Sequence, residues 1–398
     1  IHEQAKAERA IVVKVDPRAA APPGPGDLAD GLEGHGFRPA RHDLQARTPR
    51  VVDLLDGGDE LLATWDKDAR NLVRRSAKEG VTTATDLVNE LGDEGLATLA
   101  RVTAEPDYPV RIVPAGSALT YAGDPAACLA KLREAGRLNH GKLRLGMVKL
   151  VVDGSIQGFT ARVRWPGYYN GAPNGIWVIA PGELDAMVQA YHDAGAQLHI
   201  HTNGDEATEL AIDAIDRALR RSPRRDHRHT LQHCQMADAA QFRRMASLGM
   251  CVNLFANHIF YWGDAHYALT MGPDRANRMD ACASAARAGV PFAIHSDAPI
   301  TPLGPLFTAW CAVNRQTASG RVLGESERIS VEAALHAITL GAAYTLHMDH
   351  LVGSIEVGKH ADFCVLREDP LAVPAQRLKD IEVLGTVIGG RPLGPRGG

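Results

Sequence analysis

The chain has 398 residues, of which 45% are apolar and 23% are charged, and its formal net charge is −4. This composition can fill a large buried core, so it excludes a collagen-like or largely disordered chain. The near-neutral charge gives no electrostatic reason to expect nucleic acid or an anionic membrane as a partner. No apolar run approaches the roughly 18 residues that a membrane-spanning helix needs.

The N-terminal segment, residues 1–58, is expected to be irregular because residues 16–50 are rich in proline, glycine, arginine and aspartate. The chain begins at Ile1 without a methionine and has no secretory signal pattern. We therefore expect that the gene begins further upstream. A helical pattern over residues 59–78 then opens a larger domain, predicted to cover residues 59–345.

Short apolar runs alternate with amphipathic helical patterns through this domain, which predicts βα units and a parallel sheet. The predicted strands are residues 81–85, 110–113, 148–152, 197–201, 229–233, 250–254 and 291–295. The helical patterns are clearest over residues 181–194, 205–221, 237–248, 275–288 and 330–344. The class is a TIM (β/α)8-type barrel of roughly 250 residues, in which the carboxyl ends of the strands carry the chemistry. Seven strands are found where a closed barrel has eight.

Residues 346–398 have a different character, with glycine-bounded runs at 353–359, 361–366 and 381–390. These runs predict hairpin-like strands of a small β domain. The domain is small for independent stability, so we expect it to pack against the barrel.

Histidine is the compositional outlier: 17 are present, and nine of them lie within residues 192–295. Histidine is both a common metal ligand and a common acid or base, so the clustering is a functional signal. The six cysteines are scattered without a CxxC pair, which favours a reducing cytoplasm over a disulfide framework.

Three side chains at strand ends suggest a metal site. His201 and His233 end consecutive predicted strands, and Asp297 follows the last one. Neighbouring strands lie about 4.8 Å apart, so the two histidines can reach one ion. The alternative for either histidine is a buried ring that hydrogen-bonds a backbone carbonyl. For Asp297 it is a helix cap or a loop hydrogen bond.

Lys149 lies inside an apolar strand, where burial disfavours its charge. One interpretation is a salt bridge to a nearby carboxylate. The other is that the neutral amine reacts with carbon dioxide and forms a carbamate, an anionic ligand that can bridge two divalent metals.

The ordered motifs together resemble the amidohydrolase superfamily, and within it amidohydrolase family 3, the YtcJ-like and N-substituted formamide deformylase-like branch. The matching stretches are residues 80–83, 148–155, 200–205, 229–235, 296–299 and 353–362. The resemblance implies a metal-dependent hydrolase barrel followed by half of a β-sandwich domain. It also implies that Lys149 is a carboxylated bridging ligand, that His201 and His233 hold the inner metal, and that Asp297 binds the outer metal and shuttles protons.

The family's His-x-His motif on its first strand has no counterpart here. His199 and His201 have that spacing but lie on a later strand. We therefore expect that the sequence lacks the family's N-terminal part, which another segment or chain would supply. We expect this chain alone to bind at most one divalent metal tightly, and none if the open barrel collapses; the metal expected is zinc, and the complete family site holds one or two ions.

The activity implied by the resemblance is attack of a metal-bound hydroxide on an amide- or formamide-type carbon, with cleavage of a non-peptide C–N bond and Asp297 as general base and acid. A lactone or ester hydrolase would use the same residues. A non-catalytic or regulatory fragment is the alternative outside the enzyme class. We expect a small-molecule substrate, a cytoplasmic location and a homodimer, with no nucleic acid or membrane partner.

Four further residues are candidate substrate contacts. Asp153 follows the strand of Lys149. By strand alternation His295 points into the barrel on the same side as Asp297 and one layer below it, where it either binds a ligand or fills space. His258 and Trp262 lie in an aromatic segment after the sixth predicted strand, which suits a substrate wall or a loop packed on its neighbours. The aromatic residues 165, 168 and 169 raise the same two possibilities.

Overall fold

The computed structural model describes residues 79–106, 108–121 and 123–393, so the predictions for residues 1–58 and 59–78 lie outside the described residues. The strands are β1 (Thr83–Asn89), β2 (Arg111–Ser117), β3 (Met147–Val151), β4 (Gln197–Thr202), β5 (Thr230–His233), β6 (Cys251–Leu254), β7 (Phe292–Ile294), β8 (Phe363–Leu366), β9 (Val383–Ile388) and β10 (Arg391–Leu393). The α-helices are α5 (Asp93–Ala104), α6 (Pro125–Ala135), α7 (Pro181–Asp193), α8 (Asp205–Arg221), α9 (Ala239–Leu248), α10 (Asn257–Ala265), α11 (Gly272–Ala276), α12 (Cys282–Ala288), α13 (Pro305–Asn314), α14 (Val331–Ala337) and α15 (Leu340–Tyr344). In the part of the chain described, no helix is both long and apolar enough to cross a membrane.

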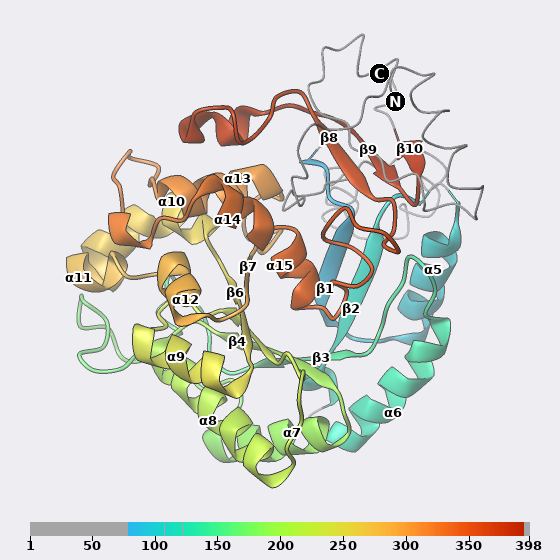
Figure 1. Ribbon diagram of the computed structural model, residues 1–398. Coiled ribbons are helices and arrows are strands. Elements are labelled where there is room, and N and C mark those ends of the chain that lie inside the picture. Colours follow the sequence, from blue (N-terminus) through green and yellow to red (C-terminus); the bar gives the residue numbers. More distant parts are fainter. Residues whose placement is uncertain (1–78, 107, 122, 394–398) are drawn as a thin grey trace.

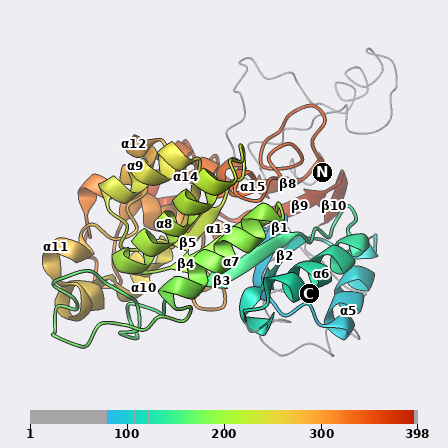
Figure 2. The same ribbon diagram turned by 90° about the horizontal axis from the view of Figure 1, so that it is seen from below.

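The main sheet contains seven parallel strands in the order β1-β2-β3-β4-β5-β6-β7, which confirms all seven predicted strands. The sheet curls into an open half-barrel, and helices α5 to α9 follow one another around its outer side (Figure 1 and Figure 2). Strands β1 and β7 each pair with one neighbour in this sheet, so they form its two edges. The carboxyl ends of the strands therefore meet on one face, as the predicted barrel class requires.

Helix α8 shows how closely local sequence sets the elements here, because its bounds match the predicted range. Its small and apolar residues form a buried stripe that includes Ala211, Ile212 and Ile215. Acidic residues occupy its first turn and Arg220 and Arg221 its last, which complements the helix dipole. Packing and end charges thus favour the same segment.

Two predicted helices are each broken in two. The segment 275–288 forms α11 and α12, separated at Asp280, whose φ of 45° is left-handed. The buried Arg315 guanidinium donates to the carbonyls of Met279 and Asp280, so this turn is held by a tertiary contact. The segment 330–344 forms α14 and α15, with a break at Thr339. Both predictions of a single helix were wrong, because amphipathic spacing does not report such contacts.

The C-terminal residues form a three-stranded antiparallel sheet in the order β10-β9-β8, which lies beside β1 and β2 (Figure 1 and Figure 2). The predicted strand over 353–359 was wrong, since this segment forms turns. In these turns Lys359 Nζ donates to Ser354 Oγ, which in turn donates to Glu356. Side-chain hydrogen bonds of this kind compete with a strand ladder.

A buried ion pair joins the small sheet to the barrel. The Arg111 guanidinium donates through Nε and Nη2 to the two Asp362 oxygens, at 2.8 and 3.0 Å, and the side chains are 5% and 0% exposed. Gly389 N–H also donates to Asp362 Oδ1 at 2.8 Å. The carboxylate therefore connects β2 with the turn that follows β9.

We expect Asp362→Asn to lower the free energy of unfolding by about 3–5 kcal/mol, because it leaves the Arg111 charge buried and unpaired. Asparagine keeps an oxygen that accepts the Gly389 N–H, so the loss of stability reports mainly the removal of the Asp362 charge. Urea unfolding measures the change. The matched control is Asp274→Asn at an exposed pair with Arg278, which should change stability by less than about 1 kcal/mol. A loss at Asp362 no larger than this control would contradict the assignment.

Candidate metal centre

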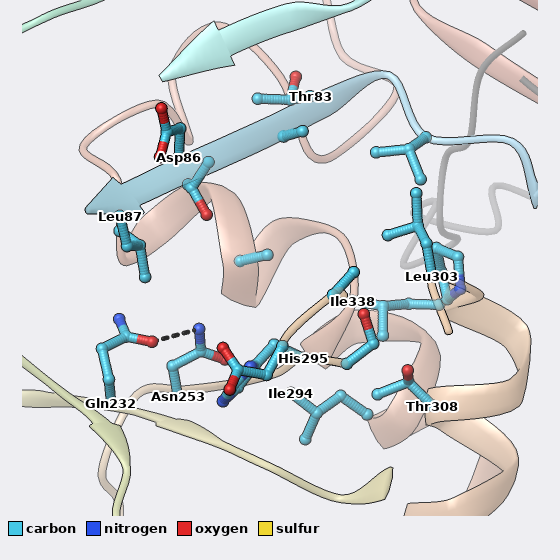
Figure 3. A pocket seen from close by; sticks show the side chains of 18 of the residues that line it. Thr83, Asp86, Leu87, Gln232, Asn253, Ile294, His295, Leu303, Thr308 and Ile338 are labelled. Atoms are coloured by element: carbon cyan, nitrogen blue, oxygen red, sulfur yellow. Dashed lines mark hydrogen bonds between the residues drawn. The ribbon is translucent and has the colours of Figure 1, made fainter. Parts of the chain in front are cut away.

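A cavity of about 500 Å³ opens between the two edge strands of the barrel. Strand β1 runs along one side, and Gln232, Asn253 and His295 lie on the opposite side (Figure 3). The segment after β7, including Asp297, also lines it. The cavity thus joins the barrel interior to the strand ends at which the predicted metal ligands lie.

Three side chains come together at this position. His233, His295 and Asp297 each offer a ligand atom, and these atoms all lie within 4.8 Å of one another. His233 ends β5, and the other two follow β7. His233 and Asp297 have left-handed backbones, with φ of 68° and 51°. Such strain in a residue other than glycine costs about 1–3 kcal/mol and clusters at functional sites.

His201 lies next to this trio without being part of it. Its ring centroid is 4.5 Å from that of His233. Its Nε2 lies 3.1 Å from the Gly154 carbonyl and 3.2 Å from Asn203 Nδ2. Of the two histidines predicted as ligands, the structure therefore brings His233 together with Asp297, and places His295 rather than His201 beside them.

Lys149 lies on β3 and is 3% exposed. Burial lowers its pKa to about 7, against the opposing effect of the Asp297 charge. No described residue forms a salt bridge with it. The structure therefore gives no support to the salt-bridge interpretation within this range, and burial shifts the lysine toward its neutral form.

The trio has the properties of a divalent metal site. Burial lowers the pKa of His295 to about 3 and that of His233 well below its usual range, so both rings are neutral, the form that binds metals. His233 Nδ1 and His295 Nε2 are buried and have no hydrogen-bond partner among the described residues. Two imidazoles and a carboxylate match the ligands that zinc and related ions accept.

Asp153 lies beside this site and ties its loops together. Its carboxylate accepts N–H groups from Arg162, Asn203 and Gly204, each at 2.9 Å, and is 0% exposed. Burial raises its pKa to about 7, while these three donors oppose the shift. The arrangement gives Asp153 a structural role in fixing the loops after β3 and β4. Its predicted contact with substrate stays a prediction.

The aromatic segment after β6 reaches the metal site through one residue that the sequence did not single out. Phe255 stacks on His295, with centroids 4.9 Å apart and an interplanar angle of 21°. Phe255 also contacts His258, with centroids 4.8 Å apart, and the His258 ring lies 4.4 Å from that of Trp262. By contrast, the Trp165 side chain is 93% exposed, on the surface of the long segment after β3.

The cavity walls hold an unusual number of free polar atoms. Side-chain atoms that line the cavity and are buried without a partner among the described residues are Thr83 Oγ1, His199 Nε2, Asn253 Oδ1, His295 Nε2 and Thr308 Oγ1. Buried polar atoms are normally satisfied, so a concentration of free ones indicates a place for polar ligand or water. Gln232 joins two of these residues, since its amide contacts His199 at 2.7 Å and accepts from Asn253 at 2.9 Å.

A curled parallel sheet with a histidine–carboxylate cluster at its carboxyl ends defines a class of metal-dependent hydrolase barrels. The family can be named as well, because the profile described as the amidohydrolase family matches residues 47–393. The chain belongs to the amidohydrolase family.

Similar proteins agree with this assignment. YtcJ of Bacillus subtilis (strain 168) is 29% identical over 259 residues, which are 64% of this chain and 48% of that protein. The N-substituted formamide deformylase of Arthrobacter pascens is 32% identical over 199 residues, 49% of this chain and 36% of that protein. The chain thus spans about half or less of these relatives. A metal-dependent hydrolase from Pyrococcus horikoshii OT3 has the same fold, with a TM-score of 0.64 and 21% identity over 79% of this chain and 63% of that one.

Proposed function

We propose that this protein hydrolyses a non-peptide C–N bond of a small amide- or formamide-type molecule in the cavity between β1 and β7. The observation that carries the proposal is the cluster of His233, His295 and Asp297 at the strand ends that line this cavity. The choice of bond follows the relative that is named as a formamide deformylase.

The trio would hold the divalent cation. His201 lies next to His233 and could add a neutral imidazole as a further metal ligand. When bound, a cation such as zinc polarises a carbonyl oxygen and brings the pKa of water to about 7. Asp297 is the proton carrier among these residues. Burial raises its pKa, so its carboxylate can accept a proton and return it to a leaving nitrogen.

The cavity sets the kind of molecule that fits. About 500 Å³ is within the range of small-molecule sites. Leu87 and Ile294 contribute apolar surface, whereas Asn253 Oδ1 and Thr83 Oγ1 have no hydrogen-bond partner among the described residues. An amide with one apolar substituent would use both kinds of surface.

The test is hydrolysis of N-formyl and N-acyl amines by the purified chain with added zinc, beside lactones and aryl esters at equal concentration. Turnover of the amides supports the proposal. Turnover of esters or lactones alone would replace it with an ester hydrolase, and no turnover of any substrate, with metal bound, would favour the regulatory alternative.

We expect metal analysis to find one tightly bound divalent ion per chain. The described residues bring three ligand atoms together at one position, which is a ligand set for one ion. Equilibrium dialysis against zinc followed by elemental analysis measures the number. The His233→Ala variant should bind at least about tenfold more weakly. Two tightly held ions in the isolated chain would contradict the expectation.

We further propose that Lys149 carries a carbamate when the metal is bound. Its low pKa and its place near Asp297 support this, because a neutral amine is the form that takes up carbon dioxide. We expect zinc affinity to fall by about tenfold in buffers stripped of bicarbonate, and the affinity of a Lys149→Met variant to be independent of bicarbonate. An equal response of both proteins would argue against the carbamate.

A further inference from the structure

The turn that follows β7 carries Asp297 and is closed by one hydroxyl group. Within this turn the Ile300 N–H donates to the Asp297 carbonyl at 2.7 Å. Thr301 Oγ1 donates to the carbonyl of Ser296, the residue directly before Asp297. A left-handed backbone such as that of Asp297 persists only where surrounding contacts hold it. The Thr301 hydroxyl supplies such a contact.

A second loop holds this hydroxyl in place. Asn257 is the first residue of α10, and its Nδ2 donates to Thr301 Oγ1 at 2.9 Å. Asn257 is 0% exposed and Thr301 is 1% exposed, so water does not compete for the bond. The two side chains therefore form a clamp that joins the loop after β6 to the turn after β7.

The direction of the two hydrogen bonds follows from the backbone acceptor. A carbonyl only accepts, so the Thr301 hydroxyl proton points to Ser296, and the lone pairs of Oγ1 face Asn257. The Asn257 atom that meets them must then be the Nδ2 donor. This orientation leaves Asn257 Oδ1 buried without a partner among the described residues. An apolar residue of the same size would avoid that desolvation cost, so stability alone does not account for an asparagine here.

The loop after β6 also contacts a second member of the metal trio. Phe255, two residues before Asn257, stacks on His295 with ring centroids 4.9 Å apart. The loop thus holds the Asp297 turn through hydrogen bonds and His295 through a ring contact. Two of the three side chains whose ligand atoms lie within 4.8 Å of one another are therefore supported by this one loop.

We propose that Asn257 and Thr301 are positioning residues that fix the turn 296–301, so that the Asp297 carboxylate stays within the metal trio. Neither residue lines the cavity, so both act through the turn and not on the substrate. The effects on metal affinity and on hydrolysis rest on the metal centre of the proposed function, whereas the effect on the turn does not.

Zinc affinity and hydrogen exchange test the clamp without any substrate. We expect Thr301→Val to weaken zinc binding by about 10–100-fold and Asn257→Leu by about tenfold, the usual effect of removing a group that orients a metal ligand. Thr301→Ser keeps the hydroxyl and should keep the wild-type affinity. In the metal-free chain, the backbone amides of residues 296–301 should exchange about fivefold faster in Thr301→Val, the factor that corresponds to one hydrogen bond.

Thr103→Val is the matched control. Thr103 lies in α5 and is 0% exposed. Its hydroxyl likewise donates to a backbone carbonyl, that of Leu99 at 2.6 Å, and lies 3.0 Å from a side-chain nitrogen, His140 Nε2. This variant loses similar bonds, yet its zinc affinity and the exchange of residues 296–301 should stay at the wild-type values. Zinc affinity in Thr301→Val no lower than in this control would overturn the positioning role.

Kinetics separate the clamp from the proposed function. With the best amide from the screen and saturating zinc, Thr301→Val should lower kcat by about tenfold with little change in KM, and Thr301→Ser should restore kcat. If the wild-type chain binds zinc but hydrolyses nothing, the proposed function fails, while the zinc affinities still decide the clamp. If it binds no zinc, the metal centre is refuted, and unchanged exchange in Thr301→Val would refute the clamp as well.

Discussion

Asp297→Asn is expected to reduce kcat for amide hydrolysis by about 10²–10⁴-fold, the usual contribution of a positioned general acid or base. The asparagine has nearly the same shape and can still present an oxygen to a cation, but it cannot take up a proton. KM should change much less than kcat. Steady-state kinetics at saturating zinc, with bound metal measured in the same samples, separate the loss of proton transfer from the loss of metal.

The matched control for this prediction is again Asp274→Asn, at a carboxylate whose side chain is 85% exposed in α11 and far in sequence from the strand ends. Its kcat should equal that of the wild type. If Asp297→Asn keeps its metal and hydrolyses the amide as fast as this control, Asp297 is not the proton carrier.

Much of the fold could be predicted because local pattern and tertiary environment agree. The strand predicted over 250–254 is observed at Cys251–Leu254, where most side chains are buried, so an apolar run is sufficient evidence. The break at Asp280 depends instead on Arg315, which is 35 residues away in sequence and reaches it only in the folded chain. Periodicity carries no information about such a contact.

The site residues divide in the same way into those that local pattern predicts and those that depend on tertiary contacts. Strand ends identified His233 and Asp297, because the carboxyl ends of parallel strands meet on one face. His295 was predicted from strand alternation as a candidate ligand contact. Its grouping with these two residues depends on how the chain turns after β7. Phe255 was missed, since no spacing signals a ring that stacks on a site residue. Phe255, one residue past the end of β6, could have been found as a strand-end aromatic.

The chain should lose stability steeply in mild acid, because it buries many neutral histidines. Burial lowers the pKa of seven rings strongly: His199, His201, His229, His233, His258, His266 and His295. The unfolded chain protonates these side chains below about pH 6.5, whereas the folded chain does not, so their stabilisation is complete above that pH and is lost as the pH falls. Each contributes a slope of at most about 1.4 kcal/mol per pH unit.

Three buried carboxyl groups act in the opposite direction. Burial raises the pKa of Asp153, Asp280 and Asp297, so the folded chain takes up their protons before the unfolded chain does. The histidines outnumber them. We therefore expect the free energy of unfolding, measured by urea titration with a chelator present, to fall by about 3–5 kcal/mol per unit between about pH 6 and 5.

A single ring away from the metal centre tests the cause of this slope. His229 accepts the Leu198 N–H on Nδ1 and therefore donates from Nε2 to His192 Nδ1, which leaves no room for a second proton. His229→Gln should be less stable at neutral pH, yet its stability should fall less steeply with acid, by about 1.4 kcal/mol per pH unit. The exposed His350 supplies the control, since His350→Gln should keep the wild-type slope. Equal slopes in all three proteins would mean that buried histidines do not set the acid limit of the fold.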